Sequence, residues 1–568
     1  MVLSIVRRRP MLLALALAAV LGAPALAAAQ APSRLAIAIP ADDGSLTPYT
    51  FESGYAFMSL IYDTLLWRDT RGVARPWLAR AVTRSADGRI VRVDLRPGVR
   101  WHDGRRLTAA DVAFTYRFMA QRSHPRFTPQ LQDIERVETD GELGVLFRLR
   151  RPSLAFEDQP LADVPILPRH LWAGLERDRR APPGRAIGSG PYRLSSYEPG
   201  RRYRLRASRG YFRGTPSVAR IDVPVIRRQD AIFDQLRRRR VDVVPVAVPP
   251  GLTPEILPGV RLAREPSYTG TMLVFNVRRR PFDRLVARRA VARALDLDAI
   301  AGNATGAPGG VVPADRGIVH PRSRWARAGV LHRYEPSAAR LAFAEQGISA
   351  FRVAAPRNDP VRLAAATRVV RALTDAGARA ELLELSPSDL DRALGRSGAP
   401  ASFDVAVLGI PALASYDPAF LRAIFGDPRT ASLNDGGYRS RAFDDLADSA
   451  VAAGTERERR ELVNDELRLL ARELPVVPLL FGGGTFAYRP MAYDGWVSIR
   501  GSGIVDKRSF LRAGAAQPTN GAGTDPAAGP GDLIDSSDDD GFSLVPIIIA
   551  FVVLALAGAA WWLRQRRT

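Results

Sequence analysis

A histidine and an aspartate stand side by side in the stretch GVRWHDGRRLTAADVAFTY, residues 98–116. A His102–Asp103 pair is a combination that general acid–base catalysis uses. The neighbouring residues favour a structural role, because Asp103 is followed by glycine, a strong turn signal. Thr108 and Asp111 also have the spacing of a helix-capping box. We therefore predict a turn followed by a helix, with His102 satisfying the turn rather than moving protons.

No other part of the sequence carries a recognisable catalytic or metal-binding signature. There is no G-x-S-x-G, P-loop, H-E-x-x-H or EF-hand motif. Cysteine is absent, which excludes disulfides, thiolate metal sites and a cysteine nucleophile. No two histidines stand four residues apart, and they are scattered at His102, His124, His170, His320 and His332. We predict no catalytic residues, no metal site held by the protein and no cofactor.

The elements around the His-Asp stretch follow from hydrophobic periodicity. Residues 91–95, VRVDL, and 143–151, LGVLFRLRR, alternate apolar and polar side chains, which is typical of half-buried strands. After Thr108, apolar side chains at Val112, Tyr116 and Met119 fall on one helical face. The stretch is thus expected to lie between strands and to begin a helix.

The second half of the sequence alternates helical and strand patterns. Residues 360–377 are amphipathic and end on a glycine, a common helix stop, and 378–385 and 403–409 follow as strands. This alternation predicts a mainly parallel sheet. Residues 473–490, ELPVVPLLFGGGTFAYRP, are predicted as a strand, a glycine turn and a second strand.

Both ends of the chain have the composition of membrane-directed segments. Three arginines, an apolar run and small residues in an A-x-A pattern predict a signal peptide over 1–31. Residues 542–564 contain an uncharged run of the length that spans a bilayer, so we predict a transmembrane helix followed by a cytoplasmic tail at 565–568. Residues 513–541 are rich in Gly, Pro, Ala and Asp and are predicted to be a disordered tether.

The formal net charge of +22 lies on the body of the chain. Six arginines in the signal and the tail cancel six aspartates in the tether. Such a charge would suit an acidic partner. Lys507 is the only lysine among 81 basic residues, however, and the arginines are spread along the chain rather than gathered into a stripe. We therefore predict no nucleic-acid partner.

Several motifs together resemble the extracytoplasmic solute-binding proteins of ABC importers, in the peptide/nickel class (family 5). The resemblance covers most of residues 33–500, and the order and spacing of the motifs carry it. The similar segments are YDTLLWRD (62–69), LRPGVRWHDGRRLTAADVAFTY (95–116), GSGPYRLSSYEPG (188–200), ASRGYFRGTP (207–216), FNVRRRPFDRLVARRAVARALDLDAI (275–300), YEPSAARLAFAEQG (334–347) and ELPVVPL (473–479).

The resemblance implies an α/β, two-lobed periplasmic-binding-protein-like fold with an extra small domain in the first lobe. Ligand would lie between the lobes and hinge closure would bury it, with no catalytic step. The expected parts are a first lobe formed by 32–72, 187–282 and 476–512, an extra subdomain at 73–186 and a second lobe at 283–475.

The family's second lobe carries a loop ending in Asp-Pro, matched here at Asp417. In peptide binders an aspartate a few residues earlier typically pairs with the α-amino group of the ligand, and that place falls here at about Ala414 or Ser415. Asp417 itself fits a turn role better. The expected ligand-binding residues are Tyr49, Tyr268, Thr269, Thr271, Ser415, Tyr416 and Asp417. Surface or hinge packing is the competing interpretation for each.

The resemblance implies a monomer outside the cytoplasm that captures a peptide or peptide-like solute. Its partners would be an ABC permease and ATPase, and the C-terminal helix would hold it at the plasma membrane. The permanent anchor leaves a second interpretation open, a membrane-anchored ligand sensor or docking subunit with the same fold.

Overall fold

In the computed structural model, all described residues belong to one unit of the chain. The described residues are 33–511 except 41, 43, 51–54, 123, 176–185, 245–257, 305–310 and 349. The predicted signal peptide, tether, transmembrane helix and tail therefore lie outside the described residues. Within the described ranges, none of the helices has the length and apolar character needed to cross a bilayer.

The N-terminal part contains two four-stranded sheets and a hairpin. The first sheet has the order β1 (Arg34–Ala36), β10 (Arg220–Pro224), β9 (Arg202–Ala207) and β8 (Tyr192–Glu198), with only β1 and β10 parallel. The second is antiparallel, in the order β4 (Ala79–Arg84), β5 (Ile90–Leu95), β7 (Gly144–Leu149) and β6 (Ile134–Asp140). The hairpin joins β2 (Leu66–Arg68) to β3 (Ala74–Pro76).

The helices of this part are short except one. α3 (Ala109–Gln121) packs on β6 and β7, and α2 (Tyr55–Ile61) packs beside β8. The others are η1 (Thr128–Leu131), η2 (Glu157–Leu161), α4 (Arg169–Trp172), α5 (Gln229–Arg237) and η4 (Lys507–Phe510). One hydrophobic core, which we call the first core, draws on residues 35–243 and 486–510.

The alternation predicted for this part is confirmed. Val91, Val93 and Leu95 of β5 are buried, while the arginine and the aspartate between them are partly exposed. This is the pattern of a strand with one face on the core. On α3, Val112, Tyr116 and Met119 are all buried, as the spacing predicted.

The largest sheet has the order β11 (Val243–Val244), β17 (Val476–Tyr488), β12 (Arg261–Phe275), β16 (Val405–Ile410), β14 (Ala350–Pro356) and β15 (Arg379–Leu385). A further strand, β13 (Val312–Pro313), pairs with β17. The prediction of a mainly parallel sheet is correct only for β16, β14 and β15. It is wrong for the rest, because β12 and β17 are joined to each other and to their other neighbours by antiparallel pairing.

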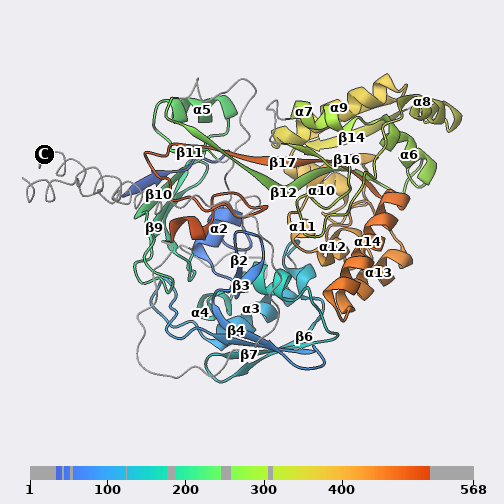
Figure 1. Ribbon diagram of the computed structural model, residues 1–568. Coiled ribbons are helices and arrows are strands. Elements are labelled where there is room, and N and C mark those ends of the chain that lie inside the picture. Colours follow the sequence, from blue (N-terminus) through green and yellow to red (C-terminus); the bar gives the residue numbers. More distant parts are fainter. Residues whose placement is uncertain are drawn as a thin grey trace, which may run out of the picture. The chain divides into compact units, whose positions relative to one another are not determined.

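Helices cover both faces of this sheet (Figure 1). Leu273 and Phe275 point to one face and Met272 and Val274 to the other, as strand pleating requires. The first face packs on α6 (Leu285–Ala294), α7 (Leu297–Ala304), α8 (Pro336–Glu345) and α9 (Pro360–Asp375). The second face, which holds what we call the second core, packs on α10 (Pro387–Leu394), α11 (Leu413–Tyr416), η3 (Pro418–Phe420), α12 (Leu421–Phe425), α13 (Arg441–Ala452) and α14 (Glu456–Glu473).

Strands β12 and β17 are much longer than their neighbours and run side by side (Figure 1). One end of the pair joins β11, and the other end joins β16. The prediction of a glycine turn within 473–490 is wrong, because residues 476–488 form one continuous strand. Both halves of β17 find partners in β12, and this pairing overrides the local turn preference. The glycines instead lie opposite a register shift at Pro266–Gly270.

Candidate functional site

The His-Asp stretch is part of the framework of the first core. The His102 ring lies between two backbone groups, with Nδ1 accepting from the Gly188 amide at 3.2 Å and Nε2 2.9 Å from the Gly190 carbonyl. Burial lowers the pKa of His102. Asp103 contacts a different ring, His170 Nε2, at 2.6 Å. The two residues therefore do not form an acid–base pair, and His102 fastens the GSGPY segment.

The two glycines of that segment are required by a close approach. A Cβ on Gly188 or Gly190 would lie 2.0 or 2.3 Å from a backbone oxygen at the end of α2. The Gly190 amide instead donates to the Ile61 carbonyl at 2.8 Å. The capping prediction is also confirmed, since the Thr108 amide donates to Asp111 Oδ2 at 2.9 Å at the start of α3.

Tyr268 and Tyr416 come together from β12 and from α11. Their ring centroids are 5.0 Å apart, and His320 lies 5.0 Å from Tyr268 on another side. The Tyr416 hydroxyl donates to the Arg500 carbonyl at 2.8 Å, and burial raises the pKa of Tyr416 to about 12. The Arg68 guanidinium lies 4.2 Å from the centre of the Tyr416 ring. The arrangement is an aromatic cluster with a cation on one face.

Asp417 is fully buried and its partners belong to the protein. Its carboxylate accepts from the Ala419 amide at 2.9 Å at the start of η3, which confirms the predicted turn role. It also forms an ion pair with Arg459 Nη2 at 2.5 Å. The backbone carbonyl of Asp417 accepts from Gln159 Nε2 at 2.8 Å. Asp417 therefore holds the loop together through its Oδ1 atom and its backbone carbonyl, while its buried Oδ2 atom has no hydrogen-bond partner among the described residues.

The other predicted binding residues have separate positions. Ser415 is buried, and its Oγ accepts from the His320 amide at 2.9 Å. Thr271 is buried in β12 between β16 and β17, and Thr269 on the same strand is exposed. Tyr49 packs against Phe118, His124 and Trp172 of the first core, and its hydroxyl donates to a backbone carbonyl at Arg122. Their roles in ligand binding stay predictions.

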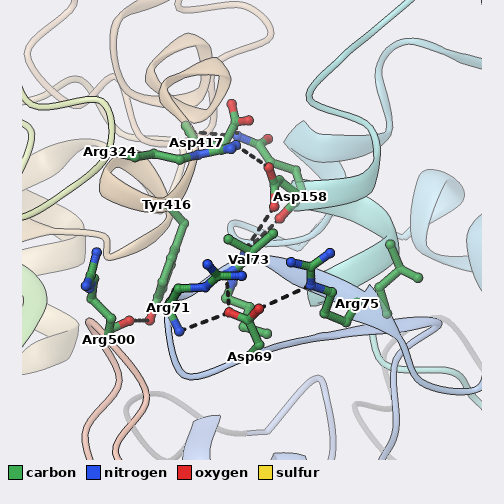
Figure 2. A network of polar contacts seen from close by, with 12 residues as sticks. Asp69, Arg71, Val73, Arg75, Asp158, Arg324, Tyr416, Asp417 and Arg500 are labelled. Carbon is green, nitrogen blue, oxygen red and sulfur yellow. Dashed lines mark hydrogen bonds and ion pairs between the residues drawn. The ribbon is translucent and has the colours of Figure 1, made fainter. Parts of the chain in front are cut away.

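Arg68, Asp158 and Arg324 form a network that the residue pattern did not reveal. Asp158 Oδ2 accepts from Arg324 Nη2 at 2.5 Å (Figure 2). Asp158 Oδ1 lies 3.4 Å from Arg68 Nη1. Burial raises the pKa of Asp158, and the negative charge of Asp417 raises it further. The positive charges of Arg68 and Arg324 lower it, but the net shift is upward. Asp158 thus joins η2, on the first core, to the loop that carries Arg324.

The β2–β3 turn that follows Arg68 is built on Asp69. Asp69 Oδ1 accepts from the amides of Arg71 at 2.9 Å and Val73 at 3.0 Å, and Oδ2 lies 3.1 Å from Arg75 Nε (Figure 2). A turn held by side-chain acceptance from its own backbone is an Asx-type turn. It fixes the hairpin on which Arg68 stands. The aspartate of the motif YDTLLWRD is the sequence signal for this turn. The motif does not indicate that Arg68 pairs with Asp158.

A second aromatic and cationic group lies on the first core. Arg126 forms a two-point ion pair with Asp163, at 2.6 and 2.9 Å, and stands 4.0 Å from the centre of the Tyr55 ring. Tyr55 is stacked parallel to Trp67 at 6.4 Å. Burial alone would raise the pKa of Asp163, but Arg126 holds it below its ordinary value. This group supplies flat aromatic faces beside a fixed positive charge.

Ion pairs also connect the first core to α12 and α13. Asp133 lies 2.6 Å from Arg422 and 2.8 Å from Arg151, and Arg151 reaches Asp448 at 2.6 Å. We call these ion pairs and the contacts of Asp158 and Gln159, taken together, the seam. The seam consists of Asp133, Arg151, Asp158 and Gln159 on the first-core side and Arg324, Asp417, Arg422 and Asp448 on the second-core side.

The carboxylates of the seam are paired with arginines, so its groups are arranged to hold the two sides together by ion pairs. In the part of the chain that the structure describes, three or more His, Asp or Glu side chains nowhere gather in the geometry of a metal site.

Comparison with known proteins gives a consistent relationship. The family model for bacterial extracellular solute-binding proteins, family 5 (Middle), matches residues 73–432. The oligopeptide-binding protein AppA of Bacillus subtilis is 26% identical over 251 residues, which is 43% of this chain and 46% of that protein. Protein XP55 of Streptomyces lividans is 27% identical over 348 residues, 59% of this chain and 63% of its own length. The chain thus spans about half the length of the first of these relatives.

Solved structures extend the likeness in fold. AppA from Bacillus subtilis in complex with a nonapeptide superposes with a TM-score of 0.73 at 21% identity, covering 84% of this chain and 99% of that one. AgaA from A. tumefaciens R10, in complex with agropinic acid, gives 0.73 at 21% identity with 84% and 97% covered. NikZ from Campylobacter jejuni with Ni(L-His) gives 0.69 at 21% identity, over 81% of this chain and 94% of that one. The α/β fold of the body is therefore that of these binding proteins.

Proposed function

Because the chain belongs to the bacterial extracellular solute-binding proteins of family 5, we propose that it captures a small peptide or peptide-like solute between two lobes and delivers it to an ABC importer. Members of this family are extracytoplasmic binding proteins rather than enzymes. The seam is the observation that carries the proposal. It places polar and charged groups of the first core against the second core, and beside it Arg68 lies over the Tyr416 ring of the Tyr416–Asp417 loop.

The proposed ligand position is beside the Tyr268–Tyr416 cluster and Arg68. Aromatic rings suit a ligand with apolar or flat groups, and Arg68, held by Asp158, places a positive charge beside them. Asp417 is neutralised by Arg459, so it does not provide the anion that would hold an α-amino group. Ala414 and Ser415 provide none either. The proposed ligands are therefore peptide-like solutes whose recognition does not depend on a free ammonium group.

The ligand is identified by analysing what remains bound to the purified chain. Native mass spectrometry is followed by calorimetry with each candidate, in the wild type and in Tyr416→Phe and Arg68→Gln variants. An Arg105→Gln variant is the matched control, since Arg105 is exposed and distant in sequence. The proposal predicts binding that Arg68→Gln weakens and Arg105→Gln does not. Absence of binding across peptide, sugar and metal-chelate panels would contradict it.

Closure is a separate part of the proposal and has its own measurement. Ligand binding should stabilise a form in which the seam contacts are made, so small-angle scattering should show a smaller radius of gyration after ligand is added. An unchanged profile with saturating ligand would rule out a hinge. The continuous strands β12 and β17, with their register shift at Pro266–Gly270, are the proposed place of bending.

We further propose that residues 542–564 anchor the protein in the plasma membrane, with 513–541 as a tether. Their composition supports this. A tether of this length has a root-mean-square reach of about 30 Å, which keeps the body near a membrane partner. The test is fractionation: the full chain should sediment with membranes and resist alkaline carbonate extraction, and a chain ending at residue 512 should not.

A ligand sensor or docking subunit is the second candidate, and the predicted anchor favours it. Cross-linking in intact cells followed by affinity purification separates the two. Recovery of a permease and its ATPase supports delivery to an importer. Recovery of a signalling kinase or an envelope structural protein without them supports the sensor.

A further inference from the structure

A cavity of about 210 Å³ lies where α6, from the first face of the largest sheet, meets the C-terminal half of α14, from the second face, and the loop 314–333. Its inner wall is apolar. The side chains that form this wall are Phe425, Leu467, Leu470, Leu474 and Val476. None of the residues that line the cavity belongs to the seam or to the predicted ligand-binding set. The cavity is therefore a second site, separate from the one proposed above.

The mouth of the cavity carries three arginines. Arg293 is paired with Glu335 at 3.0 Å. Arg289 and Arg333 are exposed and form no ion pair with any residue in the described ranges. Asp315 also lines the cavity, and His332 is kept neutral near pH 7 because burial lowers its pKa. The charges of Arg293 and Glu335 cancel each other. The guanidinium groups of Arg289 and Arg333 then outnumber the single carboxylate of Asp315, so the mouth has a net positive charge.

Exposed apolar side chains stand next to the residues of this mouth along the chain. Val286, Val330 and Tyr334 are 41%, 60% and 52% exposed, and they are among the few large apolar side chains of the described residues that face solvent. Val286 stands three residues before Arg289 on α6, and thus on the same helical face. Val330 and Tyr334 flank the lining segment 331–333. Apolar surface of this kind marks binding sites more often than free surface.

We propose that this cavity binds a small anionic amphiphile, in which a short acyl or similar apolar chain ends in a carboxylate or a phosphate. The chain fills the apolar interior, and Arg289 and Arg333 hold the anionic group at the mouth. Guanidinium groups bind carboxylates and phosphates through paired hydrogen bonds. The apolar rim covers the part of the chain nearest the head group.

The shape and the charge favour this occupant over the alternatives. A docked protein helix needs a long groove, whereas this site is a partly enclosed cavity lined by α6, α12, α14, the start of β17 and the loop 314–333. A neutral amphiphile would leave the two guanidinium groups without a partner. A cationic amphiphile would be repelled by them.

Photo-affinity labelling of the full chain in membrane vesicles tests the proposal. The probe is octanoic acid carrying a diazirine in its chain, and the labelled peptides are mapped by mass spectrometry. We expect labelling on residues 467–478 and beside Phe425, blocked by excess octanoate or octyl phosphate and not by octyltrimethylammonium. A stronger block by octanoate or by octyl phosphate identifies which head group is preferred. Equal block by the cationic competitor would overturn the proposal.

Two variants locate the site. The double variant Arg289→Gln/Arg333→Gln should raise the octanoate concentration needed for half-protection about tenfold, the effect of losing charged hydrogen bonds. Arg105→Gln/Arg209→Gln removes two exposed arginines outside the cavity and should change nothing. Ala471→Phe places a ring in the cavity and should abolish labelling there. Labelling that is unchanged in the first and the third variant would show that the amphiphile binds elsewhere.

Discussion

Replacing Glu466 by glutamine is expected to stabilise the protein increasingly as the pH rises. Glu466 lies on α14 and is 1% exposed, with Arg422, Arg459 and Asp417 as its charged neighbours. Burial raises the pKa of Glu466 from 4.5 to about 8, against the pull of the two arginines. Its Oε1 atom has no hydrogen-bond partner among the described residues. A glutamine keeps the size of this side chain without the cost of a buried charge.

The sign and size of the effect follow from proton linkage. Between pH 4.5 and about 8 the folded chain keeps a proton on Glu466 that the unfolded chain has released. The free energy of unfolding of the wild type therefore falls as the pH rises through this window. Above pH 8, the destabilisation caused by Glu466 no longer changes with pH. At about 1.4 kcal/mol per pH unit, the loss is on the order of 3 kcal/mol at pH 7. The Glu466→Gln variant does not lose it.

The assay is urea unfolding of both chains at pH 5 and at pH 8, followed by circular dichroism. The difference in the free energy of unfolding between variant and wild type should be small at pH 5 and on the order of several kcal/mol at pH 8. Glu461→Gln is the control on the same helix, because Glu461 is exposed and its pair with Arg457 is worth only a few tenths of a kcal/mol. A Glu466→Gln difference that is equal at both pH values would refute the reasoning.

Three further outcomes are expected. Arg422→Gln removes the partner that faces Asp133 at 2.6 Å across the seam, so the radius of gyration of the ligand-bound form should increase and ligand affinity should fall about tenfold. Tyr416→Phe removes the hydrogen bond to the Arg500 carbonyl, and the free energy of unfolding should fall by about 1 kcal/mol. Lys507 is fully buried against Asp63 at 2.7 Å, so an amine-specific reagent should modify this only lysine in urea and not in buffer. Rapid modification of the folded chain would contradict the buried pair.

Local patterns in the sequence predicted some of the elements correctly, and the motifs led to the family by resemblance. The alternation at 91–95 corresponds to β5, and the spacing of Thr108 and Asp111 corresponds to the start of α3. The role of Asp417 in a turn followed from the proline beside it. These features depend on residues that are close in sequence. Their capping and turn preferences are met by local backbone geometry, whatever the rest of the fold is.

Features that depend on distant partners were not predictable in this way. Residues 482–484 carry a turn signal, yet they are extended because β12 pairs with both halves of β17. The ion pairs of Asp158 with Arg68 and Arg324 join residues 90 and 166 positions apart. Judged by sequence alone, many other arginines could have paired with Asp158. Only the packing of the folded chain brings Arg68 and Arg324 to it.

From the sequence by itself, hydrophobic periodicity and helix caps indicated strands and helices, and the order and spacing of several motifs resembled the family 5 solute-binding proteins, because both kinds of signal are local. Tertiary structure alone decided which charges are available. It buries Asp417 against Arg459, keeps Glu466 protonated near neutral pH and leaves Arg289 exposed at the mouth of a cavity. The physical reason is that desolvation and ion pairing depend on neighbours in space, and the same carboxylate or guanidinium is a structural tie or a binding group according to what surrounds it.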